Sequence, residues 1–251
     1  MKNSTIRKIS FGLTTIIILV LIWVIVSARN NGDFLYPSIG QILKKMGENL
    51  NKDNTISFLN TIFRVLIAVT VSIFISLIII CLYIRFKDSI SLFSPIITLL
   101  KTVPFICISL FIILLFSKTK FIGLMVISII LILPIGVETL KNGVDNIPRS
   151  IIDDLNTLDI SFFRKLFSVY LPLLLPNILL VFLETFGLGF KIMIMAEYFM
   201  QMKNSVGILI YNAKTFLEMD SLIGYTIIIV LLVGIGDILV KLLSNRLKIE
   251  Y

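Results

Sequence analysis

The side chains in this sequence that could do chemistry are a few charged residues embedded in long apolar runs. No histidine occurs, which excludes imidazole acid–base catalysis and most transition-metal sites. A charge inside an apolar run is costly in lipid, so it normally faces a cavity or another part of the protein. Such residues can line a solute path or form ion pairs that fix the packing of helices. We predict no catalytic residue and no metal site. The candidates are Arg64, Lys101, Glu184, Lys191 and Glu197.

The positions of these charged residues differ in how clearly they separate a role in a solute path from a role in packing. Glu184 and Lys191 lie seven residues apart, which places both on one face of a helix. They either line a translocation path or take part in an interhelical ion pair, and the sequence leaves both interpretations open. Glu197 lies just beyond the same run. Arg64 lies one to two turns inside its run, where a long side chain can reach the interface, so packing or anchoring is favoured over a substrate contact.

Several common activities find no support in the sequence. No phosphate-binding loop of the form G-x-x-x-x-G-K-S/T is present, so any ATP hydrolysis belongs to another chain, and no cofactor is predicted. Cys81 and Cys107 stand singly in apolar runs, which is typical of small buried side chains rather than of a disulfide or a metal pair. The net charge of +8 fits the excess of Lys and Arg in loops that flank membrane spans, so no nucleic-acid partner is expected.

Composition and run length indicate the elements that must position these charges. Hydrophobic residues make up 57% of the chain and charged residues 15%, whereas soluble domains carry about 25% charged residues. Continuous apolar runs of roughly 20 residues, the length that crosses a bilayer as a helix, indicate an all-α polytopic membrane protein with one domain over residues 1–251. The core of the domain is expected at about 57–243. About six spans are predicted, at residues 11–28, 58–84, 92–116, 121–140, 167–195 and 221–242.

Two of these runs allow more than one interpretation. The run at 11–28 follows a basic start and resembles a signal peptide, but its length favours an uncleaved helix. The run at 92–116 contains Pro95 and Pro104, with Lys101 between them. Proline removes a helix hydrogen bond, and in a membrane such a break persists only where protein or water satisfies the freed backbone. This pattern favours a kinked helix that faces a pathway, although kinks are common in spans.

The distribution of Lys and Arg predicts the orientation in the membrane. With the N-terminus inside, the inner segments hold 12 of the 23 cationic residues and the outer segments hold 8. Positive charge is enriched on the cytoplasmic side of membrane proteins. Both termini are therefore predicted to be cytoplasmic, and so is the loop at about 141–166.

The cytoplasmic loop carries helix signals of its own. Ser150 followed by Asp153 has the form of a capping box and predicts a helix over 151–158, and Ser161 is expected to cap the next helix. The short helix either inserts its apolar face into a groove on a partner or lies on the inner leaflet, and spacing alone does not separate these alternatives. That apolar face consists of Ile151, Leu155 and Leu158.

The loop resembles a motif of a known family, the membrane permease subunits of ATP-binding-cassette (ABC) importers of the nitrate/sulfonate/taurine type. The family pattern is approximately E-A-A-x-x-x-G followed by two Leu-Pro pairs. The matching stretch here runs from Asp153 to Asp159, followed by Leu171-Pro172 and Leu175-Pro176. Where the family pattern has glycine, this chain has Asp159, and aspartate tolerates the left-handed backbone conformation less well than glycine does. Further matches are the segments Asn60–Val65 and Ala196-Glu197 followed by Gly207-Ile208-Leu209-Ile210.

The resemblance implies a mechanism and partners. Two permease subunits, either two copies or two related chains, would form the path in a bacterial inner membrane. Each would place its loop helix in a cleft of a cytoplasmic ABC ATPase dimer, while an extracytoplasmic binding protein delivers the solute. Ile151, Leu155 and Leu158 would be the packing face. Asp153, Asp154 and Asp159 would make polar contacts with the ATPase.

Two other functions compete with the importer subunit. An ion-coupled secondary transporter would need intramembrane carboxylates and often shows internal repeats. Glu184 is the clear carboxylate inside a run, and the sequence shows no repeat. A membrane scaffold without transport activity would leave the proline-containing runs unexplained.

Overall fold

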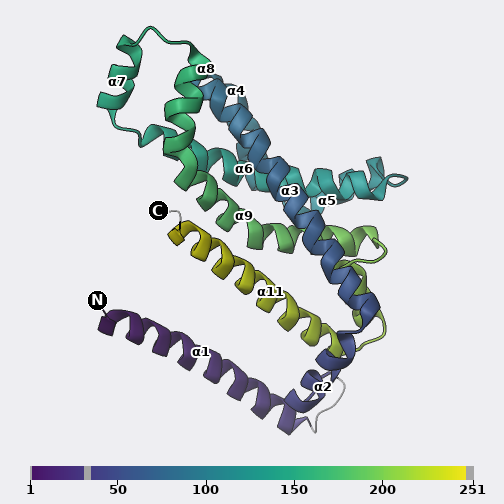
Figure 1. Ribbon diagram of the computed structural model, residues 1–251. Coiled ribbons are helices and arrows are strands. Elements are labelled where there is room, and N and C mark those ends of the chain that lie inside the picture. Colours follow the sequence, from purple (N-terminus) through teal and green to yellow (C-terminus); the bar gives the residue numbers. More distant parts are fainter. Residues whose placement is uncertain (1, 31–34, 247–251) are drawn as a thin grey trace.

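The computed structural model describes residues 2–30 and 35–246, which form helices joined by short turns, without a strand in those ranges (Figure 1). The predicted all-α class is therefore confirmed. In chain order the helices are α1 (Lys2–Arg29), α2 (Ile39–Asn49), α3 (Lys52–Arg85), η1 (Lys87–Ser89), α4 (Ile90–Thr102), α5 (Phe105–Leu115), α6 (Lys120–Asp145), α7 (Arg149–Thr157), α8 (Phe162–Lys165), η2 (Leu166–Tyr170), α9 (Leu171–Met200), α10 (Val206–Thr215) and α11 (Met219–Arg246).

Four stretches of the described chain are long and apolar enough to cross a membrane. They are α3, α6, α11 and the continuous helix formed by α8, η2 and α9, and the bent pair of α4 and α5 would be a fifth. The polytopic membrane class is confirmed, while the predicted count of six is approximate. The predicted run at 11–28 lies within α1, but several of its side chains lie outside the described part of the chain. The apolar stretch described there, Val20–Arg29, is too short to span by itself.

The helices define two ends of the bundle. Figure 1 shows α7 and α8 at one end and α2 at the opposite end. The start of α1 and the end of α11 both point away from α2 (Figure 1). We call these the α7 end and the α2 end. In the orientation predicted from the cationic residues, the α7 end is cytoplasmic.

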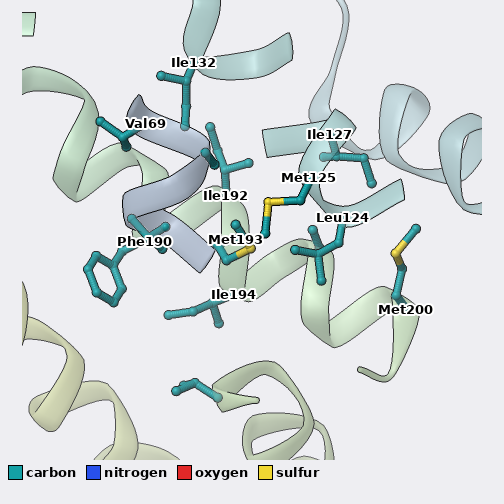
Figure 2. Close-up of a cluster of buried hydrophobic side chains, with 14 of the residues drawn as sticks. Val69, Leu124, Met125, Ile127, Ile132, Phe190, Ile192, Met193, Ile194 and Met200 are labelled. Atoms are coloured by element: carbon teal, nitrogen blue, oxygen red, sulfur yellow. The ribbon is translucent and has the colours of Figure 1, made fainter. Parts of the chain in front are cut away.

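The centre of the bundle is formed by α3, α6 and α9, which pack against one another. Their interface buries Val69 of α3, Leu124 and Ile132 of α6, and Met193 of α9 (Figure 2). Between helices in lipid, such apolar packing stabilises through close van der Waals contact rather than through removal of surface from water. This packed centre holds the charged side chains of α3, α6 and α9 at fixed positions relative to one another.

The predicted third span is two helices that meet at a sharp bend. α4 ends at Thr102, α5 begins at Phe105, and the two are bent by 102°. Pro104 accounts for the break, because a residue before proline is forced toward extended backbone and Val103 has ψ 128°. Pro95 lies inside α4 without ending it. The segment predicted as one kinked span over 92–116 is therefore two helices, which form either a broken span or a re-entrant loop.

Candidate functional site

The loop between α6 and α8 (residues 146–161, hereafter the α7 loop) holds a short helix that begins differently from the prediction. Pro148 is the N-cap residue, and its carbonyl accepts hydrogen bonds from the amides of Ile151 and Ile152 at 3.0 and 3.4 Å. The helix therefore starts at Arg149, and Ser150 is already helical. No side-chain cap hydrogen bond forms at Pro148. The predicted capping box of Ser150 with Asp153 is wrong, because the helix begins two residues earlier than predicted and Ser150 already lies in its first turn.

The predicted apolar face of this helix divides into a buried and an exposed part. Leu155 is only 5% exposed, and Ile151 is half-buried. Leu158 lies just after the helix in extended backbone and is 52% exposed. The predicted polar contacts Asp153, Asp154 and Asp159 are all exposed. Leu155 thus packs within the chain, whereas Leu158 and the three aspartates remain accessible to a partner.

The segment that follows the α7 loop matches its prediction. Ser161 is the N-cap of α8, and its hydroxyl accepts a hydrogen bond from the Arg164 amide at 3.4 Å. The chain then runs through the π-helical turn η2 into α9 without leaving helical structure. Pro172 lies at the start of α9 and Pro176 inside it. The two Leu-Pro pairs therefore lie in the first two turns of α9, within the continuous helix that α8 begins.

A polar cluster joins the ends of α3 and α6 next to the α7 loop. The Tyr83 hydroxyl donates to Asp145 Oδ1 at 2.6 Å, and Lys141 Nζ donates to Asp145 Oδ2 at 2.6 Å. Lys87 of η1 lies 3.9 Å from the same carboxylate. Asp145 is the last residue of α6, so three contacts fix the point where the chain enters the α7 loop. This cluster could not be predicted from the sequence, because its members lie up to 62 residues apart.

The α2 end contains a buried network that brings together two of the predicted charges, Arg64 and Glu197. Arg64 Nη1 donates to Glu197 Oε1 at 2.7 Å, and the Thr61 hydroxyl lies 3.0 and 2.9 Å from the two carboxylate oxygens. The Gly207 amide donates to Glu197 Oε2 at 3.2 Å. Glu197 has no exposed surface, and Arg64 is 8% exposed. Every oxygen of this buried carboxylate therefore has donors, as a buried charge requires.

This buried network also holds α10 against α9. The Val206 amide donates to the Thr61 hydroxyl at 3.0 Å. At Gly207 an added Cβ would overlap the Tyr198 backbone nitrogen and the Glu197 Cβ, so only glycine permits this approach. At the other end of α10, Lys214 donates to the Tyr198 hydroxyl at 3.1 Å, and this contact raises the pKa of Lys214. The short apolar segment after α9 is thus a helix, fixed at both ends.

The three remaining candidates, Lys101, Glu184 and Lys191, lie on exposed sides of α4 and α9. Lys101 Nζ donates to both oxygens of Glu138 on α6, at 2.7 and 2.8 Å. Glu184 accepts a hydrogen bond from Thr139, the next residue of α6, at 2.7 Å. Neither Glu184 nor Lys191 forms an ion pair with any residue whose side chain is described. The interhelical ion pair that the sequence allowed for them is therefore not formed within the described chain.

Lys101 and Lys191 line the same cavity (hereafter the lysine cavity). Its volume is about 380 Å³, and it lies at the bend between α4 and α5, against α6 and α9. Val103 and Phe105 from the bend contribute to one wall. The other lining residues are Leu100, Leu131, Pro134, Ile135, Leu188, Ile192 and Met195. The cavity thus combines an apolar wall with two cationic side chains, and Glu138 contacts one of these cations.

Comparison with known proteins determines the family. Residues 85–249 match the family described as "Binding-protein-dependent transport system inner membrane component". The chain belongs to this family. The matched part contains α4 to α11 and all candidate charges except Arg64. Family membership confirms the resemblance inferred from the α7 loop and the Leu-Pro pairs, and the apolar helices agree with a multi-pass inner-membrane protein.

A curated relative points in the same direction. The chain is 25% identical over 154 residues to a protein of Bacillus subtilis (strain 168) named "Putative aliphatic sulfonates transport permease protein SsuC". The match covers 61% of this chain and 55% of that protein. The chain therefore matches only about half the length of this relative, and the name describes the relative rather than this chain.

Proposed function

We propose that this chain is the permease subunit of an ABC importer, which forms the solute path and is driven by a separate ATPase. The observation that carries the proposal is the family match over residues 85–249, a range that includes the broken pair α4–α5, the α7 loop and α9. A short exposed helix at one end of a bundle of membrane helices is a suitable element for insertion into a partner's groove. The printed name of the Bacillus relative, a transport permease protein, supports the same function.

The partners follow from this function. A cytoplasmic ABC ATPase dimer would meet the α7 loop, a second permease chain would complete the path, and an extracytoplasmic binding protein would deliver solute to the α2 end. This arrangement requires the α7 loop to be cytoplasmic, and the cationic residues predict that side for the loop and for both termini.

The exposure of the α7 loop residues supports a division of roles among them. Leu158, Asp153, Asp154 and Asp159 are exposed and would contact the ATPase. Leu155 and Ile151 would hold the helix on the permease itself. The Asp145 cluster would transmit movement of the loop to α3 and α6, because it ties the loop entrance to both helices.

Co-purification from native membranes tests the proposal. The tagged chain would be extracted with mild detergent, and its partners identified and counted by mass spectrometry. A nucleotide-binding ATPase at one copy per permease is the expected result. Recovery of no ATPase, under conditions that keep a known importer intact, would contradict the proposal and favour an ion-coupled carrier or a scaffold.

A further inference from the structure

An unpaired arginine lies where two membrane spans end on the same side of the bundle. Arg85 is the last residue of α3, and Phe162 is the first residue of the continuous helix that leads into α9. The Cζ atom of Arg85 lies 5.3 Å from the centre of the Phe162 ring and 5.7 Å from the centre of the Phe86 ring. Figure 1 accordingly shows α8 beside the end of α3. These contacts bring the ends of both spans together at the α7 end.

The aromatic contacts hold Arg85 in place and leave its hydrogen-bond donors free. Arg85 is exposed and forms no ion pair with any described carboxylate. The nearby Lys87 and Lys141, by contrast, both contact Asp145. Asp88 is exposed in η1 but pairs with no described cation. A guanidinium that rests on aromatic rings can still present its planar fork of N–H donors to a phosphate.

A second unpaired cation, Lys165, lies on the same helix face as Phe162. It follows Phe162 by three residues, and residues at this spacing are neighbours on a helix surface. Lys165 is half-buried and forms no ion pair within the described chain. Arg164 is only two residues from Phe162, so it lies on another side of the helix. We call Arg85 and Lys165 the Arg85 patch.

An apolar stripe on α3 leads to the Arg85 patch. Phe74, Ile78 and Leu82 are exposed and follow one another at four-residue spacing, so they share one face of the helix. From Phe74 to Arg85 the helix rises by about 16 Å, which is close to the thickness of one leaflet, half of a hydrocarbon core of about 30 Å. The stripe therefore has the length of a lipid acyl chain, and phosphate-binding donors lie at its end.

We propose that the Arg85 patch binds the phosphate of an anionic phospholipid, such as phosphatidylglycerol, with one acyl chain along the apolar stripe of α3. A zwitterionic lipid fits less well, because its choline group adds a cation beside the two of the patch. In the orientation predicted from the cationic residues, the lipid belongs to the inner leaflet, whose anionic lipids attract basic segments.

The position of the patch gives the bound lipid a role in the fold. Because Arg85 contacts Phe162 of α8, a lipid on Arg85 would hold the exit of the α7 loop. The Asp145 cluster holds the entrance of the same loop. This inference goes beyond the permease function proposed above and does not depend on it.

Native mass spectrometry of lipid binding tests the site. The full chain, with the partners that it retains in detergent, is freed of lipid and titrated with phosphatidylglycerol or with phosphatidylcholine of the same acyl chains. We expect the first phosphatidylglycerol to bind about tenfold more tightly than phosphatidylcholine. Arg85→Gln should lower the affinity for phosphatidylglycerol about tenfold, because it removes the charged donor fork. Arg164→Gln is the matched control, at the same helix end but on another side, and should change the affinity less than about twofold.

A second pair of variants separates a defined site from general attraction to positive charge. Phe162→Leu removes a ring beside Arg85 without changing the charge, so it should lower the affinity about threefold or more, because Arg85 loses its fixed position. Phe163→Leu is the control, because Phe163 is exposed and makes no described contact with Arg85. The unfolding temperature without lipid verifies that each variant is folded. Arg85→Lys replaces any variant that is not folded, and it should lower the affinity several-fold, because lysine keeps the charge but lacks the fork.

Four results would overturn the lipid site. Equal affinity for the two lipids would show that the patch does not select an anion. Equal losses from Arg85→Gln and Arg164→Gln would indicate general attraction to the basic end of the bundle. Displacement of the lipid by inorganic phosphate would make the patch a site for free phosphate. Loss of a co-purified ATPase in Arg85→Gln, at unchanged lipid affinity, would make the patch a protein contact. None of these results alters recovery of an ATPase with the unsubstituted chain, so failure of the lipid site is distinguishable from failure of the permease proposal.

Discussion

Glu197 shows how much a single buried charge depends on its donors. Its carboxylate is enclosed by Arg64, Thr61 and the Gly207 amide. Removal of one member of a buried ion pair leaves the other charged and desolvated, which costs about 3–5 kcal/mol. We therefore expect Arg64→Met to lower the unfolding temperature markedly, and the double substitution Arg64→Met with Glu197→Gln to lower it less than Arg64→Met alone.

Thermal unfolding in detergent measures this difference. Lys45→Gln is the matched control, since Lys45 pairs with Glu48 at 3.5 Å on an exposed helix face and such pairs contribute at most about 1 kcal/mol. If the double substitution is as harmful as the sum of the two single ones, the network is held by its other hydrogen bonds rather than by the pair.

Leu217 is a second residue at which the effect of a substitution on stability can be predicted. It follows α10 with φ 57°, in the left-handed region, and its side chain is 55% exposed. For a residue with a Cβ this conformation costs roughly 1–2 kcal/mol, a cost that glycine avoids. We expect Leu217→Gly to raise the free energy of unfolding by about 1 kcal/mol. The neighbouring Phe216, at φ −91° and 73% exposed, serves as control, because Phe216→Gly should give no gain in a thermal unfolding assay.

At the scale of elements, the sequence predicted the helices better than their ends. Long apolar runs predicted α3, α6, α9 and α11 because spanning length is a simple property of composition. The break at Val103–Pro104 was expected only as a kink, because a proline pattern does not show whether the chain resumes the same direction. The capping box failed at Ser150 because Pro148 starts the helix first. The pairing of Arg64 with Glu197 could not be predicted from the sequence, since the two residues lie 133 positions apart.

Two substitutions in the α7 loop are predicted to have separate effects, one on the stability of the fold and the other on binding of the ATPase. Leu155→Asp places a charge at a buried position, so it should lower the unfolding temperature, at a cost of several kcal/mol. Leu158→Asp alters an exposed position, so stability should be unchanged. If Leu158 docks on the ATPase, its substitution should cost about 2 kcal/mol or more of binding, as interface anchors do. Thermal unfolding and ATPase recovery in pull-downs measure the two effects.

The reverse pattern would contradict this division of roles. Loss of the ATPase with Leu155→Asp at an unchanged unfolding temperature would mean that Leu155 turns outward when the partner binds. Asn156→Asp is a suitable control, because Asn156 is exposed on α7 between the two leucines and receives the same charge.

At the scale of the whole molecule, the fold and the charge distribution must agree on one orientation. The α7 loop, the Asp145 cluster and the end of α11 share one end of the bundle, and the buried Arg64–Glu197 network lies toward the other. The α7 end carries the larger share of Lys and Arg in the segments outside the spans, which predicts that it faces the cytoplasm. An importer also requires this orientation, because ATP is available only to a loop on that side.

Cysteine labelling in intact cells tests the orientation. In a background of Cys81→Ser and Cys107→Ser, one variant carries Asp154→Cys on α7 and another carries Lys203→Cys between α9 and α10, and both positions are exposed. A membrane-impermeant maleimide should label position 203 in intact cells and position 154 only after the membrane is opened. Labelling of position 154 from outside would show that the protein has the opposite orientation in the membrane. The α7 loop would then lie out of reach of a cytoplasmic ATPase, and the proposed permease would have to be driven by something other than ATP.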